Sequence, residues 1–108
     1  MKNFKLKLYG DEYVAHFIIS KYTYGGGLYV GIELEDGEPW DDLSTNLEFD
    51  LPENTIAIKE YDSGKYYMTL LSDLGIIKND LGVVEQGYGT FKIVELDYQK
   101  LIQYGQVI

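Results

Sequence analysis

The chain has 108 residues, which is enough for one domain but not two, so we expect a single domain spanning residues 1–108. Its hydrophobic content of 45% and aromatic content of 15% exclude a disordered chain. The formal net charge of −9 opposes direct binding to nucleic acid or to an anionic membrane, and the lack of cysteine excludes disulfides and thiolate zinc sites.

No apolar run approaches the ~20 residues of a membrane span. Residues 1–19 alternate polar and apolar side chains, whereas a secretion signal needs a continuous apolar stretch. We therefore expect a soluble, cytoplasmic protein.

The first 60 residues show the period-two alternation of strands. The strands predicted here cover residues 4–8, 13–22, 28–36, 43–49 and 55–60. Segment 13–22 is apolar on both faces, which indicates a central strand. Pro39 is expected to keep the residues after the Asp36-Gly37 turn from pairing at once. Segment 43–49 is expected to have one strand face, formed by Leu43, Thr45, Leu47 and Phe49.

The period then changes to that of a helix. An apolar stripe at i, i+3, i+4 and i+7 is formed by Tyr67, Leu70, Leu71 and Leu74. We expect this helix to begin after Asp62 or Ser63 and to end at Gly75, where a left-handed residue is favoured.

Two further strands are predicted at 83–84 and 90–96, separated by a turn at Gly87-Tyr88-Gly89, and 98–104 forms either a short helix or a frayed end. No crossover is long enough for a βαβ unit. The predicted fold class is therefore α+β, with a twisted, mostly antiparallel sheet of about six strands and one main helix packed on a face.

The charge is concentrated in the middle of the chain. Eleven carboxylates lie between Glu33 and Asp62, with Lys59 as the only cation among them. The candidate partner-binding carboxylates in this run are Glu33, Glu35, Asp36, Glu38, Asp41, Asp42, Glu48 and Asp50. Because apolar strand residues interrupt the run, we expect a folded acidic surface that attracts basic proteins and imitates the phosphate spacing of a nucleic acid strand. The alternative is a surface that keeps the protein soluble and protects a sheet edge from pairing.

Aromatic residues add a second kind of contact. Eleven tyrosines suit protein-binding faces, and Tyr29 is a candidate beside the acidic run. Trp40 either anchors a partner or covers the sheet edge. The sequence therefore also permits a structural or adaptor module, monomeric or homodimeric, that binds through its aromatic residues.

Catalytic chemistry has weaker support. His16, the only histidine, lies in the most apolar strand and lacks a serine, cysteine or second histidine for a relay, so we expect a hydrogen-bonded core residue. Residues 36–42 lack the ligand spacing of an EF-hand, and a glycosidase pair would need a long sugar cleft. We expect no catalytic residue, no metal site and no cofactor.

Several motifs occur together in one order. They are Asp36-Gly37-Glu38-Pro39-Trp40, Leu43-Ser44-Thr45-Asn46-Leu47, Ile56-Ala57-Ile58, Leu74-Gly75, and Gly87-Tyr88-Gly89 followed by Phe91–Leu96. With them, residues 31–101 resemble a family of small acidic bacterial proteins, carried by conjugative elements and phages, that is classed as a domain of unknown function. The resemblance implies mobile DNA that must survive host restriction or CRISPR immunity, and it offers no catalytic residue.

Together these observations lead us to expect a non-enzymatic, protein-binding inhibitor of a bacterial defence nuclease. It would be an anti-CRISPR or anti-restriction protein acting as a DNA mimic on a nucleic-acid-binding effector, without binding nucleic acid or a membrane itself.

Overall fold

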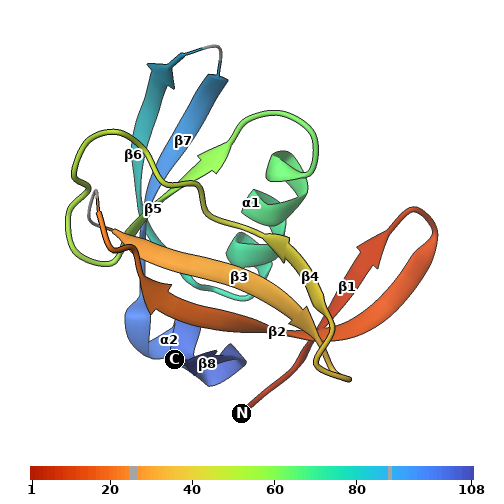
Figure 1. Ribbon diagram of the computed structural model, residues 1–108. Helices are drawn as coiled ribbons and strands as arrows, with labels where there is room; N and C mark the ends of the chain where they lie inside the picture. Colours follow the sequence, from red (N-terminus) through yellow and green to blue (C-terminus); the bar gives the residue numbers. More distant parts are fainter. Residues whose placement is uncertain (25–26, 88) are drawn as a thin grey trace.

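A computed structural model describes residues 1–24, 27–87 and 89–108 and has the predicted α+β class. Figure 1 shows two sheets with one main helix beside them. The elements are β1 (Phe4–Leu8), β2 (Asp11–Lys21), β3 (Leu28–Leu34), β4 (Pro39–Asp42), β5 (Thr55–Lys59), α1 (Gly64–Asp73), β6 (Ile77–Gln86), β7 (Gly89–Leu96), α2 (Tyr98–Leu101), a 3₁₀ turn (Ile102–Tyr104) and β8 (Gly105–Val107).

The first sheet has the strand order β1-β2-β3-β4. These neighbours are antiparallel, and β2 pairs with β1 along its first half and with β3 along its second half. Strand β8 adds a short parallel pairing to β2, at Phe17 to Ile19. The prediction of a central strand at 13–22 is therefore confirmed.

The second sheet has the order β5-β7-β6 and is antiparallel. Strand β6 begins at Ile77, six residues before the predicted strand, and contains register shifts between Ile77 and Asn79 and between Asp80 and Gly82. These bulges interrupt the alternation that strand prediction relies on. One sheet of about six strands is thus corrected to two sheets with eight strands among the described residues.

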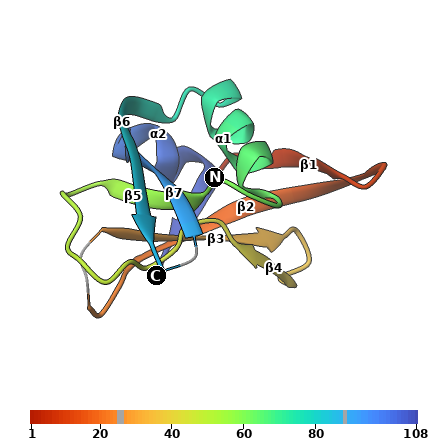
Figure 2. The same ribbon diagram turned by 90° about the horizontal axis from the view of Figure 1, so that it is seen from above.

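As predicted, one main helix packs on a sheet: α1 lies against β5 of the second sheet. Its buried residues are Gly64, Tyr67, Leu70 and Leu71, and they belong to a core that also contains Phe17 of β2. The helix ends near Gly75, whose φ of 72° matches the predicted left-handed position. In Figure 2, α1 and α2 lie on one side of β2 and β3, and no helix of the described chain covers the other side. That uncovered side is called the outer face below.

Segment 43–49 is not a strand, contrary to prediction, and only Thr45 forms a bridge, to Ala57. Leu43 is buried in the main core, whereas Leu47 is buried in a second core under β5 and β7. Phe49 is 43% exposed. The apolar residues of segment 43–49 therefore alternate with polar ones because the segment crosses from the first core to the second, not because it is a strand.

Pro39 is the first residue of β4 and does not delay pairing as expected. Proline is tolerated at the start of an edge strand because its missing N–H is not needed there. Segment 98–104 is a short helix followed by a 3₁₀ turn, with Asp97 as its cap. The predicted glycine turn at 87–89 includes Tyr88, which lies outside the described residues.

Neither helix found in the described residues is long and apolar enough to cross a membrane.

Candidate functional site

Six of the eight predicted carboxylates lie on the hairpin of β3 and β4. The sixth, Asp41, bonds to Tyr67 of α1 and is described separately. We call the other five the acidic hairpin: Glu33, Glu35, Asp36, Glu38 and Asp42. The connecting turn is closed by hydrogen bonds from the Leu34 amide to the Glu38 carbonyl (2.8 Å) and from the Gly37 amide to the Leu34 carbonyl (2.9 Å). The Asp36 side chain accepts a further bond from the Glu38 amide at 3.0 Å. The carboxylates are therefore displayed on ordered backbone.

The charge of this hairpin is not balanced by lysine. Among the described residues, the lysine salt bridges are Lys5 and Lys7 with Glu12, and Lys92 with Asp80, all outside the hairpin. Side chains two residues apart on a strand are about 7 Å apart, where two like charges in water repel by about 0.6 kcal/mol before screening by salt. The folded hairpin therefore keeps like charges close together, and no lysine salt bridge of the described chain offsets their repulsion.

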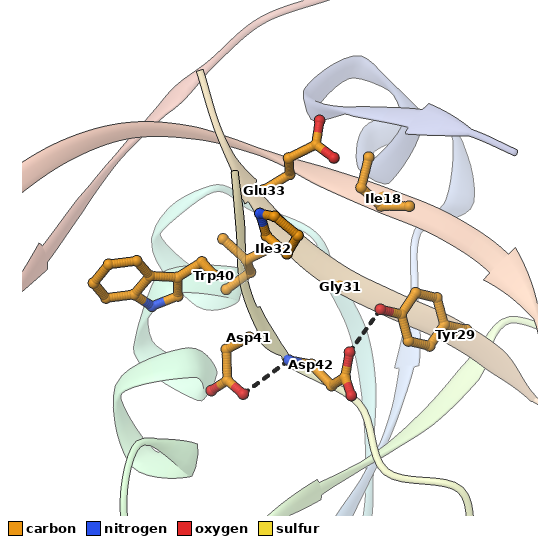
Figure 3. A pocket seen from close by; sticks show the side chains of 9 residues that line it. Ile18, Tyr29, Gly31, Ile32, Glu33, Trp40, Asp41 and Asp42 are labelled. Carbon is orange, nitrogen blue, oxygen red and sulfur yellow. Dashed lines mark hydrogen bonds between the residues drawn. The ribbon is translucent and has the colours of Figure 1, made fainter. Parts of the chain in front are cut away.

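A pocket opens beside the hairpin on the outer face, next to Gly31 of β3. Gly31 pairs with Ile18 of β2 and with Asp42 of β4, and it lies between Tyr29 and Glu33 along β3. These neighbours line a pocket of about 360 Å³, shown in Figure 3. A Cβ added at Gly31 would overlap the Tyr29 hydroxyl. We call this hollow the Gly31 pocket.

Hydrogen bonds hold the carboxylates that line the pocket. The Tyr29 hydroxyl donates to Asp42 Oδ1 at 2.6 Å. Burial, followed by this bond to Asp42, raises the pKa of Tyr29 to about 12, so its phenol remains neutral at physiological pH. On the other side of Gly31, Glu33 Oε1 is 3.0 Å from Nε2 of His16, which is only 7% exposed. His16 is thus buried and hydrogen-bonded, as expected, but it lies on the outer face.

Asp41 and Trp40 line the same pocket, yet their side chains also contact the interior. The Tyr67 hydroxyl of α1 donates to Asp41 Oδ2 at 2.5 Å. Burial and this contact raise the pKa of Tyr67 well above its usual range. The Trp40 ring lies 5.0 Å from that of Tyr13 and packs against the main core, which agrees with the alternative that Trp40 covers the sheet edge.

Glu48 and Asp50 are not part of the acidic hairpin. They lie in the loop between β4 and β5, and the Glu48 amide donates to Oε1 of Gln86 at the end of β6. Figure 1 shows this loop at the end of β3 opposite to the hairpin turn. Seven strand residues separate the two ends, a distance of about 20 Å. The predicted acidic surface is therefore divided into two regions.

The sequence reasoning missed the part played by Gly31 and Ile18. Gly31 is the one outward position of β3 without a side chain, between Tyr29 and Glu33. A glycine at such a position on a strand indicates that another group approaches the backbone closely. Gly31 could therefore have been predicted as part of the site from the sequence. Ile18 could be recognised only from its register opposite Gly31.

Within the described residues, no three histidine, aspartate or glutamate side chains form a group able to hold a metal ion. Comparisons of the chain with protein-family models, curated proteins and solved structures found no match. The resemblance to the family of mobile-element proteins therefore stays a prediction.

Proposed function

We propose that this chain is a non-enzymatic, protein-binding inhibitor that places its acidic hairpin on the basic nucleic-acid channel of a bacterial defence nuclease. The observation that supports the proposal is the concentration of five carboxylates, without a lysine salt bridge, on an ordered hairpin. Like charges that lie together on one hairpin repel each other, and a partner of opposite charge would relieve that repulsion.

The hairpin is suited to this role because its backbone is ordered before binding, so little conformational entropy is lost on association. Its charge would accelerate the encounter with a basic surface, and that acceleration would decrease as salt screens the charges. Nucleic acid would compete for the same basic surface. Binding should therefore be both salt-sensitive and displaced by DNA.

The experiment compares two double charge reversals that change the net charge equally. Glu35→Lys with Glu38→Lys alters exposed side chains of the hairpin turn, whereas Glu48→Lys with Asp50→Lys alters exposed side chains about 20 Å away. Each protein is used to capture restriction and CRISPR effectors from cells at 50 and 300 mM NaCl, with and without competitor DNA.

We expect the hairpin variant to lose the effector and the loop variant to retain it. Equal loss in both variants would show that net charge, not the hairpin, governs binding. Capture that neither the hairpin reversal nor DNA weakens would overturn the proposal and favour an adaptor module.

A further inference from the structure

We infer that the Gly31 pocket receives an arginine side chain of the partner protein. This inference rests on the proposed function and specifies which chemical group of the basic partner enters the acidic face. It is drawn from the shape of the hollow, the apolar side chains beside it and the free acceptors on its carboxylates.

The shape comes from strand register. Ile18, Tyr29, Glu33 and Asp42 occupy the four positions nearest Gly31 on the outer face, across the strands and along β3. The hydroxyl end of the Tyr29 ring lies over Gly31, and the four side chains border a hollow of about 360 Å³ beside it. That volume is within the range of pockets that bind small ligands.

Two of the walls are apolar. Ile18 and the ring of Tyr29 both line the hollow (Figure 3). An arginine side chain combines a methylene stem, which packs on apolar surface, with a planar cation that is attracted to aromatic rings. The pocket thus offers surfaces that match both parts of this side chain.

The other two walls carry unused acceptors. The Tyr29 hydroxyl donates a hydrogen bond to Asp42 Oδ1, and His16 Nε2 is hydrogen-bonded to Glu33 Oε1. In the described chain, Asp42 Oδ2 and Glu33 Oε2 have no hydrogen-bond donor, and the pocket lining contains no lysine. Guanidinium has five N–H donors in a rigid fork and can serve two separate carboxylates, whereas lysine has a compact ammonium group.

The test uses N-acetyl-arginine amide as the probe and follows backbone amide shifts by NMR. N-acetyl-citrulline amide is the control, because citrulline has nearly the same shape without the charge, and N-acetyl-lysine amide tests a different cation. We expect saturable shifts at Gly31, Tyr29 and Asp42 with the arginine probe, and at least tenfold weaker binding of both other compounds. A response to citrulline or lysine equal to that of arginine would overturn the inference.

Two matched variants locate the site. Asp42→Asn keeps the size of the side chain and an acceptor for Tyr29 but removes the charge, and we expect it to weaken binding of the arginine probe at least threefold. Asp50→Asn removes the same charge from the distant loop and should have no effect. If Asp42→Asn disturbs the spectrum as a whole, Glu33→Gln makes the same test from the other wall. Equal effects at Asp42 and Asp50 would overturn the inference.

The two proposals fail differently. If charge reversal at the hairpin turn abolishes effector capture but the arginine probe gives no local, saturable shifts, the pocket assignment is wrong and the proposed function stands. If the probe binds the pocket but hairpin reversal leaves capture intact, the pocket assignment stands and the proposed function is wrong.

Discussion

Tyr67→Phe tests the hydrogen bond that joins α1 to β4. Tyr67 is only 1% exposed, and its hydroxyl donates to the partly buried carboxylate of Asp41. The substitution removes one oxygen atom and leaves the carboxylate without this donor. A hydrogen bond to a charged group contributes about 1.5–3 kcal/mol. Because 1 kcal/mol shifts the Tm of a domain of this size by about 4 °C, we expect Tm to fall by about 6–12 °C.

A double-mutant cycle isolates this bond from other effects of the substitution. Urea denaturation of wild type, Tyr67→Phe, Asp41→Ala and the double variant gives the coupling free energy, which we expect to exceed 1 kcal/mol. The matched cycle with Tyr29→Phe and Asp42→Ala probes an exposed pair of similar geometry, where water replaces the lost partner. Coupling at Tyr67 no larger than at Tyr29 would refute the reasoning.

The same bond has a pH signature. The pKa of Tyr67 in the folded protein is raised, chiefly by burial and then by its bond to Asp41, whereas an unfolded tyrosine titrates near 10. The folded state therefore keeps a proton that the unfolded state loses above pH 10. The stabilisation is complete below pH 10 and is lost as pH rises toward the folded-state pKa. The unfolding free energy of wild type should thus fall more steeply above pH 10 than that of Tyr67→Phe, and equal slopes would contradict this.

Three further predictions concern packing and charge. Leu47→Ala should cost about 2–4 kcal/mol of unfolding free energy because Leu47 is buried. Phe49→Ala should cost less, about 1 kcal/mol, because Phe49 is 43% exposed. Equal losses in urea denaturation would contradict the assigned burial. Gly64→Ala should lower the unfolding free energy by about 1–3 kcal/mol, because the new methyl would overlap the carbonyl of Lys59, the last residue of β5. A variant that is more stable than wild type in urea denaturation would show that α1 does not approach β5 so closely. Raising NaCl from 20 to 300 mM should raise the calorimetric Tm of wild type more than that of a Glu35→Gln, Glu38→Gln variant, because screening weakens repulsion in the hairpin; equal shifts would argue against such repulsion.

The fold class was predictable because most elements bury one regular face. The stripe of α1 and the alternation of β3 each contact a single core, so their period reports their structure directly. Segment 43–49 has the same alternation for a different reason, since Leu43 and Leu47 enter two separate cores. The period of a sequence does not reveal that its apolar residues are buried in different places.

The candidate site was predictable only in part. Glu33 through Glu38 lie close together because a short turn joins β3 to β4. Residues so near one another in the chain can be predicted to lie near one another in space. The separation of Glu48 and Asp50 from the hairpin depends on the path of a loop that packs against the second sheet. Likewise, Asp41 faces Tyr67 because the pairing of β3 with β4 shifts register beside Ile32. No pattern in the sequence predicts this shift.

Strand β8 has a consequence for how the chain folds during synthesis. Gly105 pairs with Phe17, so the first sheet is completed by residues near the opposite end of the chain. A ribosome that adds about 5–20 residues per second takes roughly 4–18 s to reach Gly105 after Phe17. During that interval, one edge of β2 lacks β8 and its backbone groups there are open to other strands. The strand pairing of the sheet that displays the acidic hairpin is therefore completed only late, after β8 has been synthesised.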